Sequence, residues 1–489
     1  MKNIVYYIAI ATVLLFASCA SELDTEPSGS QVSDEQLGEL IKENADLVLA
    51  PMMQGAVNYM HTGNHRATTN DRGFMVWNLG MDLQGNDMVL TKLTNWFADE
   101  YMFESIRAQT NAYTADRWYC YYKIVYQSNQ ILDLIPDDVT GKALVYKAQA
   151  LTYRALAYYY LMCVYQDDYM HGGKDKAGVP LYLTVEGAKG RTPSTEVYST
   201  ITTDLQNAIA LFEQEGYDPK SSTADIDQTV ANMVLARVAL TTGDYTTAAN
   251  AAGAVISAGY SLMNEEQYTT SGFQSTSLPE TIWGYTWAAS TSLGNRSFAS
   301  FMSITAVDNA NNKGSYMAID DQLSKQIAAT DYRKKNFNAT ETTVGEFTYP
   351  AYSNVKFNTP TYEADEIYMR LSEAYLLKAE AEARGGNSSA AQQTLYDLVS
   401  KRDSDYAKSS NTGEALLKEI FLQSRIELWG EGHEFFTNKR FNVGVDRTAS
   451  SNHTHKLVKA AGKEFTYQIP LSIELNSNPY INAADQNPL

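Results

Sequence analysis

Two long segments of the sequence, 61–115 and 260–365, are rich in aromatic residues and in side chains that form hydrogen bonds. An aromatic ring contacts the apolar face of a ligand, while Asn, Asp and Arg side chains bind its polar groups. We therefore expect the ligand-binding residues to come from these two segments. The candidates are Trp77, Asn86, Asp87 and Trp96 in the first segment, and Tyr285, Trp287 and Arg296 in the second.

Two groups among these candidates have a second explanation. Trp283, Tyr285 and Trp287 alternate along a predicted strand and so share one of its faces, which can equally be the packed inner face. Asn86 and Asp87 follow a glycine, and this is also an ordinary turn sequence. For both groups, the choice between binding and structure stays open at this point.

The residue patterns of common catalytic sites are not found. The sequence has no G-x-S-x-G, P-loop or H-E-x-x-H motif. Acidic pairs such as Asp167–Asp168 and Asp320–Asp321 carry little information in a chain with 57 acidic residues. His453 and His455 are two residues apart, but no cysteine or carboxylate pattern of a metal site accompanies them. We predict no catalytic residue, metal or cofactor.

The composition narrows the classes of partner. The 489 residues include 38 basic and 57 acidic side chains, so the formal net charge is −19. Binding to nucleic acid requires Lys and Arg side chains that neutralise phosphates, and this charge argues against it. The chain has 34 Tyr and 16 Phe. Tyrosine suits surfaces that are apolar on one side and wet on the other.

The N-terminus has the features of a signal peptide, which we assign to residues 1–18. Lys2 precedes an apolar run over 4–17 that is too short to span a bilayer comfortably. The small residues before Cys19 resemble the lipobox of bacterial lipoproteins, which implies cleavage before Cys19 and lipidation of that cysteine. Residues 19–32 are polar and aperiodic, as expected for a flexible tether. A plain secretory signal with an incidental cysteine is the alternative.

Helical periodicity dominates the rest of the chain, which we predict to be a single domain over 33–489. Within 194–258 and 366–432, two stretches share the layout of a tetratricopeptide unit, with two helices rich in small residues and a glycine turn between them. We therefore predict a mainly α fold: a tetratricopeptide-like helical repeat scaffold with long, irregular, partly β insertions. Unrelated helical hairpins are the alternative. The repeat helices are expected at about 33–60, 116–166, 194–258 and 366–432, and the ligand-binding insertions at about 61–115 and 260–365.

Five motifs resemble those of the SusD/RagB family of outer-membrane nutrient-binding lipoproteins, and they occur in the expected order over essentially the whole chain. They are the helix 153–165 with the turn at 178–181, Asp331-Tyr332-Arg333, the helix 368–382, the segment 425–440, and the closing stretch 469–488 with its Ile-Pro and Asn-Pro pairs. The segment between Tyr165 and Gly178 is longer than the family's usual glycine turn, so contacts made by that turn do not carry over.

The resemblance implies a lipid-anchored protein of the cell surface that binds a glycan and delivers it to a SusC-type TonB-dependent outer-membrane transporter. It implies no enzymatic activity. Ligand-binding residues do not carry over by motif, because the family's site lies in variable loops. The acidic, Tyr-rich composition suits a neutral sugar better than an anionic one.

Three other functions remain open from the sequence. An oligopeptide is an alternative ligand, because the family permits it and aromatic rings also accept peptide side chains. A glycoside hydrolase on an all-α scaffold would need two carboxylates about 5–9.5 Å apart. A repeat protein that binds only another protein is the third.

Overall fold

The structure is a computed structural model, and it describes residues 33–62, 73–93, 96–217, 223–305 and 316–489. Cys19 and the predicted signal peptide and tether lie outside the described residues. The long helices are α2 (Asp34–Glu43), α3 (Ala45–His61), α4 (Phe74–Asp82), α6 (Ala112–Leu134), α7 (Lys142–Tyr165), α8 (Ser194–Glu215), α9 (Gln228–Thr242), α10 (Tyr245–Ile256), α14 (Leu371–Arg384), α15 (Ser388–Val399) and α16 (Gly413–Glu427). The shorter ones are α5 (Ala98–Met102), α11 (Glu265–Thr270), α12 (Phe298–Met302), α13 (Asp321–Gln326) and α17 (Glu434–Arg440).

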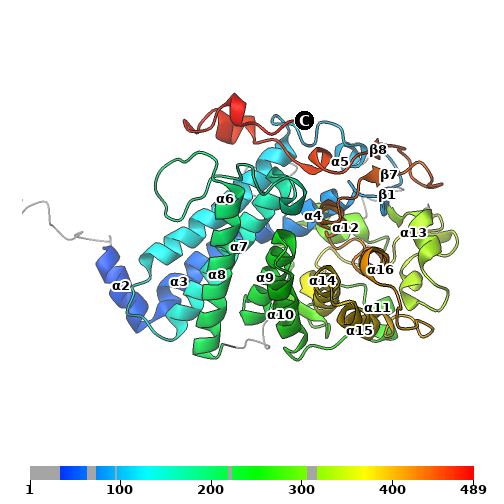
Figure 1. Cartoon of the computed structure of the whole chain (residues 1–489), viewed down its shortest axis with the longest axis horizontal. Helices are drawn as coiled ribbons and strands as arrows, with labels where there is room; N and C mark the ends of the chain where they lie inside the picture. The colour runs from blue at the N-terminus through cyan, green and yellow to red at the C-terminus, as the bar shows by residue number, and fades with distance from the viewer. Residues whose placement is uncertain (1–32, 63–72, 94–95, 218–222, 306–315) are drawn as a thin grey trace, which may run out of the picture.

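The long helices pack as antiparallel hairpins in one continuous stack (Figure 1). Within the hairpins, α6 packs on α7, α9 on α10 and α14 on α15, while α8 contacts both α7 and α9. The chain leaves the stack after α10 and returns at α14, which packs directly on α10. The prediction of a mainly α, tetratricopeptide-like scaffold with long insertions is confirmed.

Small residues allow the close approach of α10 and α14. Ala251 and Ala252 of α10 and Ala374 and Ala381 of α14 are all buried. An alanine at such a position brings two helix backbones close together, as the stacking of repeat hairpins requires. The insertion over 260–365 therefore interrupts the sequence without interrupting the stack.

The N-terminal helix differs from the prediction of one helix over 33–60. It begins with a capping box, in which the Ser33 hydroxyl accepts from the Gln36 amide at 3.2 Å and the Gln36 side chain accepts from the Ser33 amide at 3.0 Å. Asn44 then breaks the helix into α2 and α3, because its backbone is extended (φ −153°, ψ 88°). The apolar periodicity runs through the break and so conceals it.

The strands belong to the insertions and the C-terminal part, and in the described ranges they form two-stranded antiparallel pairs. The pairs are β1 (Met88–Leu90) with β3 (Met317–Ile319), β2 (Thr281–Tyr285) with β6 (Glu366–Arg370), β4 (Thr342–Val344) with β5 (Phe347–Tyr349), and β7 (Val445–Asp446) with β8 (Val458–Lys459). The β2–β6 pair joins the second insertion to the start of α14, with Tyr285 opposite Glu366.

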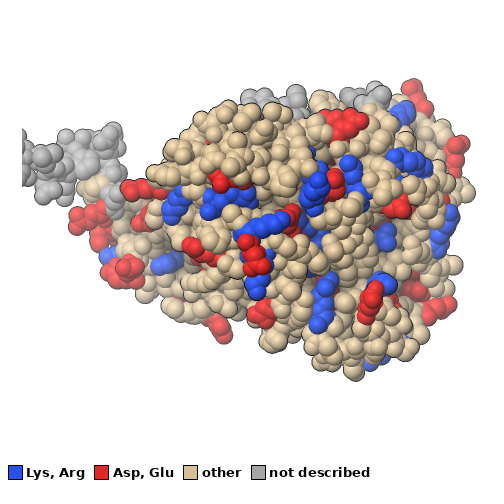
Figure 2. Space-filling view, turned by 45° about the horizontal axis from the view of Figure 1, so that its top comes forward, with Lys and Arg blue, Asp and Glu red and all other residues tan. Residues whose placement is uncertain are grey.

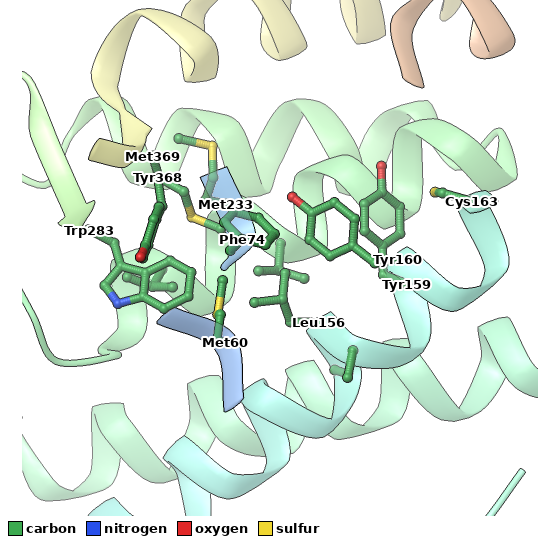
Figure 3. Close-up of a cluster of buried hydrophobic side chains, with 14 of the residues drawn as sticks. Met60, Phe74, Leu156, Tyr159, Tyr160, Cys163, Met233, Trp283, Tyr368 and Met369 are labelled. Carbon is green, nitrogen blue, oxygen red and sulfur yellow. The ribbon is translucent and has the colours of Figure 1, made fainter. Parts of the chain in front are cut away.

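A core of aromatic and sulfur-containing side chains fills the space between the stack and the insertions (Figure 3). Trp283 is fully buried there, and its ring lies edge-on to Tyr153 and Tyr368 at centroid distances of 6.1 and 5.1 Å. Phe74 lies edge-on to both Tyr160 and Tyr368. Among the helices of the described residues, none has the length and apolar character needed to cross a bilayer.

Candidate ligand-binding surface

The two insertions lie side by side, although residues 116–259 separate them along the chain. Strand β1 of the first insertion pairs with β3 of the second. A ring contact also connects the two insertions, because Phe97 lies edge-on to Phe301 of α12 at a centroid distance of 4.9 Å. The fold therefore brings both predicted binding segments to one region.

Trp96 is the predicted aromatic residue that remains accessible, with 48% of its surface exposed. Its backbone carbonyl accepts a hydrogen bond from the Tyr113 hydroxyl at 3.2 Å, which ties it to α6. The neighbouring Phe97 is buried against α12. The backbone on one side of Trp96 is thus fixed by the core, while about half of the surface of this residue remains exposed.

Two further predicted residues are partly accessible. Arg296 ends the short 3₁₀ helix Gly294–Arg296, directly before α12, and is half-buried. Tyr285, at the end of β2, is also half-buried and stacks on His61 at a centroid distance of 3.9 Å. We call Trp96, Tyr285 and Arg296 the insertion surface. In the chain, Trp96 precedes Phe97 and Arg296 lies five residues before Phe301, and these two phenylalanines form the ring contact between the insertions. Tyr285 lies against His61 at the end of α3.

Trp77 and Trp287 do not have the predicted role of ligand platforms, because both are buried. Trp77 has 2% of its surface exposed and Trp287 has 5%. Trp77 lies within α4, whose residues are all buried, and its ring is edge-on to Tyr121 at 6.0 Å. Trp287 lies edge-on to Tyr285 at 4.7 Å. Both rings pack in the interior, so the expectation for these two residues is corrected.

Asn86 and Asp87 are also structural, in agreement with the alternative interpretation as a turn. The Asp87 carboxylate is buried and accepts from Arg425 Nε at 2.9 and 3.1 Å. The Asn86 side chain donates to the Gly444 carbonyl at 3.1 Å and accepts from the Asp446 amide at 2.7 Å. These residues join the first insertion to the C-terminal part and have no polar group directed at a ligand.

A buried chain of hydrogen bonds lies next to Tyr285. The Nδ1 atom of His61 is 2.5 Å from the Tyr368 hydroxyl, which donates to a Glu366 carboxylate oxygen at 3.1 Å. Burial raises the pKa of Glu366 to about 8 and lowers the pKa of His61 to about 3. Both side chains are therefore uncharged at neutral pH. The hydrogen bond to Tyr368 holds the His61 ring, on which Tyr285 stacks.

The motifs that resemble the family contribute a second buried cluster, which we call the arginine–glutamate network. Glu427 accepts from Arg333, Arg370 and Arg402 at 3.0, 2.7 and 3.0 Å. Burial opposes ionisation of Glu427, but the three guanidinium groups lower its pKa well below the usual value. Glu280 completes the network by pairing with Arg370 at 2.9 Å and with Arg402. These buried charges hold together segments that are distant in sequence.

The structure also contains an aromatic pocket of about 280 Å³ on α6, which we call the α6 pocket. Its main lining residues are Trp118, Tyr122 and Tyr126 of α6, with Tyr182 and Val185 from the loop between α7 and α8. Trp118 Nε1 donates to Glu474 at 3.1 Å, and the Tyr122 hydroxyl donates to the Pro180 carbonyl at 2.8 Å. From the sequence, these α6 residues are expected only to form a repeat helix, and no binding role is predicted for them. The run of aromatic residues over 118–126 was the available signal.

The acidic pairs and histidines considered for catalysis serve structural roles. Asp320 caps α13 by accepting from the Gln322 and Leu323 amides, and Asp321 pairs with Lys325 at 2.6 Å. His453 is buried, 2.6 Å from the Tyr101 hydroxyl and 2.9 Å from the Asn86 carbonyl. Across the described ranges, no three His, Cys, Asp or Glu side chains are grouped as metal ligands.

The surface charge is mixed on the face shown in Figure 2, where acidic and basic side chains are interspersed among larger uncharged areas. The basic residues on this face do not gather into a continuous patch. This face therefore does not carry the continuous basic patch that is typical of a nucleic-acid-binding surface.

Two family models match the sequence over adjoining regions. The model described as "SusD family" matches residues 260–483, and the one described as "Starch-binding associating with outer membrane" matches residues 26–240. A comparison with curated proteins finds no match.

Several solved structures share the fold. A SusD-like carbohydrate-binding protein from Bacteroides vulgatus has a TM-score of 0.77 at 23% identity, covering 90% of this chain and 98% of that one. A SusD superfamily protein from Bacteroides thetaiotaomicron has a TM-score of 0.75 at 21% identity, covering 90% and 100%. Surface glycan-binding protein A from Bacteroides uniformis has a TM-score of 0.67 at 17% identity, covering 90% and 99%.

At these identities the structural likeness shows the fold alone, and the family models add the evidence from sequence. The two matched regions together contain the arginine–glutamate network, α6 and both insertions. The chain belongs to the SusD/RagB family.

Proposed function

We propose that this protein is a non-catalytic, lipid-anchored protein of the cell surface that binds a neutral oligo- or polysaccharide and delivers it to a SusC-type TonB-dependent outer-membrane transporter. Membership of the SusD/RagB family supports this proposal, as does the outer-membrane association in the description of the model matched by residues 26–240. The insertion surface is the proposed site of glycan binding.

The exposed ring of Trp96 is the observation that carries the proposal. Sugar rings have apolar C–H faces bordered by hydroxyls, and a flat aromatic ring covers such a face while adjacent polar groups bind the hydroxyls. Trp96 supplies the ring and Arg296 the hydrogen-bond donors. Because the core fixes Phe97, little backbone ordering is needed on that side when a ligand binds.

Isothermal titration calorimetry tests this function directly. Residues 19–489 are titrated with maltoheptaose, cellohexaose, xylohexaose and mannohexaose. We expect binding of at least one glycan and an affinity about tenfold lower in Trp96→Ala, which corresponds to about 1.4 kcal/mol. Tyr480→Ala is the matched control, because Tyr480 is an exposed aromatic residue far from Trp96 in sequence. Equal affinity of Trp96→Ala and wild type would remove the insertion surface from the proposal, and absence of binding to every glycan would overturn it.

The membrane anchor and the transporter require separate tests in cells. Metabolic labelling with an alkyne fatty acid is expected to label the wild-type protein and to leave Cys19→Ala unlabelled. The tagged wild-type protein is expected to co-purify with a large β-barrel protein from detergent-solubilised outer membranes. A Cys19→Ala protein that is still labelled, or a purification that yields no barrel protein, would contradict the corresponding part of the proposal.

An oligopeptide is the second candidate ligand, and the α6 pocket favours it. The pocket has the size of one large side chain, and its buried polar atoms are already paired within the protein. Such a pocket accepts an apolar side chain without leaving a buried polar group unpaired. Titration with a tryptic digest of casein tests this alternative. Binding that is lost in Tyr126→Ala but retained in Trp96→Ala would favour peptide as the cargo.

A further inference from the structure

A concavity separate from the α6 pocket lies between α14, α15 and the segment that precedes α11. It has a volume of about 980 Å³, and its lining includes Tyr260, Tyr332, Tyr375, Tyr396, Asp397 and Lys401, a set that we call the tyrosine groove. None of these residues belongs to the insertion surface or to the α6 pocket. In Figure 1, α11 and α15 lie at the lower edge of the molecule, whereas α5, which directly follows Trp96, lies at the upper edge.

Three half-buried tyrosine rings come together from three different elements. Tyr260 precedes α11, Tyr375 lies on α14 and Tyr396 lies on α15. Tyr396 is stacked on Tyr406, at a centroid distance of 6.3 Å and an interplanar angle of 25°. Half-exposed rings on helices provide flat apolar faces whose positions are fixed before any ligand arrives.

The floor of the tyrosine groove includes Tyr332, Met263 and Arg402, and Arg402 is a member of the arginine–glutamate network. The Tyr332 hydroxyl donates to the Met263 carbonyl at 3.3 Å and accepts from Arg402 Nη1 at 2.9 Å. Arg402 also donates to the Met263 carbonyl at 2.8 Å and to Glu427 at 3.0 Å. Since each of these groups is buried or paired, the floor is rigid and a ligand would not need to rearrange it.

The rim carries hydrogen-bonding groups of both charges. Asp397 and Lys401 are exposed, one helical turn apart at the end of α15. Asp397 accepts from the Gln393 side chain at 2.7 Å and lines the same groove as Tyr375. Burial, and after it the charge of Asp397, raises the pKa of Tyr375. A rim with one acidic and one basic group attracts neither anions nor cations strongly, and both groups bind hydroxyls.

We propose that the tyrosine groove is a second glycan-binding site, separate from the insertion surface, which takes a neutral oligosaccharide segment of several sugar rings. The volume lies at the upper end of the range for small-molecule sites, roughly 300–1,000 Å³, and so exceeds the space that one sugar needs. The combination of flat rings, a rigid polar floor and hydroxyl-binding rim groups matches sugar chemistry. The class of ligand follows the proposed function, but the site itself does not depend on the insertion surface.

Hydrogen–deuterium exchange of the wild-type protein locates the bound glycan without any substitution. Residues 19–489 are incubated with a saturating excess of maltoheptaose, cellohexaose, xylohexaose or mannohexaose. We expect at least one glycan to slow exchange in peptides covering 258–266 and 392–404. Protection confined to peptides around 96–105 and 285–300 would overturn the second site while leaving the proposed function intact. Protection at neither region with any of the glycans would overturn both.

Substitutions then separate the two sites by affinity. The double variant Tyr375→Ala/Tyr396→Ala is expected to lose the slow exchange at 392–404 and to bind at this site about tenfold more weakly. The double variant should keep the protection near Trp96. Trp96→Ala should lose the protection near residue 96 and keep that at 392–404. Lys401→Ala changes only an exposed side chain, so it tests the site if the double variant folds poorly, with an expected loss of about threefold. Tyr480→Ala is the control.

Three results of the variant experiment would overturn the proposal. The first is unchanged protection at 392–404 in both the double variant and Lys401→Ala. The second is loss of protection in the control. The third is protection of 392–404 by casein peptides but by none of the four glycans, which would reject the sugar as the ligand class.

Discussion

The insertion surface and the arginine–glutamate network differ in almost every physical respect. The network consists of buried charges, each held by several partners, and three of its members, Arg333, Arg370 and Glu427, lie within the motifs that resemble the family. The insertion surface consists of Trp96, which is about half exposed, and two half-buried side chains, and none of the three lies within such a motif. Residues that identify the family therefore hold the frame together, while the residues proposed to bind the ligand lie outside the motifs.

The difference has an energetic basis. A buried charge that loses its partner is strongly destabilising, so residues of the network constrain one another. A half-exposed side chain makes few contacts, and its replacement changes folding little. Substitution in the network should therefore act on stability, and substitution in the insertion surface should act on affinity.

The largest effect is expected for Glu427→Ala. The change leaves the guanidinium groups of Arg333, Arg370 and Arg402 without their shared carboxylate, and we expect a loss of about 5 kcal/mol in the free energy of unfolding. Urea denaturation followed by circular dichroism measures this loss. Glu414→Ala is the control, since Glu414 forms an exposed pair with Lys418, and its midpoint should not change. Equal midpoints for the two variants would contradict the structural role of the network.

The next effect concerns pH and Glu366. Its pKa of about 8 lies above the usual value of 4.5, so the folded protein retains a proton that the unfolded chain releases between these values. Wild type is therefore expected to lose stability relative to Glu366→Gln as the pH rises from 5 to 8, by about 1.4 kcal/mol per pH unit, with no further change above pH 8. Denaturation midpoints at several pH values test this. Glu346 is exposed, so the stability of Glu346→Gln should depend on pH in the same way as that of wild type. If the stability of Glu366→Gln also followed wild type at every pH, Glu366 would not be a buried acid with a raised pKa.

A smaller effect on stability is expected when the buried Trp287 and the half-exposed Trp96 are each replaced by alanine. Trp287→Ala removes a buried ring and should lower the free energy of unfolding by about 3 kcal/mol. Trp96→Ala removes a ring that is half exposed and should change it by less than about 0.5 kcal/mol. Thermal denaturation of the two variants compares them directly. Similar losses for both would mean that Trp96 also packs in the interior.

The smallest effect is expected for Arg296→Ala. A hydrogen bond between a half-exposed guanidinium and a sugar hydroxyl contributes about 0.7 kcal/mol, so the affinity should fall about threefold without a change in stability. Calorimetry with the best glycan of the panel measures it. Lys174→Ala, at an exposed cation elsewhere, is the control for a general effect of charge. A loss as large as that of Trp96→Ala would make the polar contact, rather than the ring, the main determinant of binding.

Local patterns predicted the helices well. The periodicity over 194–215 predicts a helix, and α8 spans Ser194–Glu215; the apolar run over 142–166 corresponds to α7 at Lys142–Tyr165. Asn44 shows where this reasoning fails, because a helix break leaves the apolar spacing on either side unchanged. The candidate site was predicted only in part, since Trp96, Tyr285 and Arg296 are accessible but Trp77, Trp287, Asn86 and Asp87 serve the structure.

The sequence by itself determined which segments are helical, where the hairpins turn, and which family the motifs resemble, because these properties depend on residues close together in the chain. Only the tertiary structure decided which aromatic rings face solvent. Trp77 and Trp96 occur in the same insertion, yet Trp77 is buried with its ring against Tyr121 of α6, while Trp96 stays 48% exposed. Burial depends on what packs against a residue from elsewhere, and no local pattern contains that information.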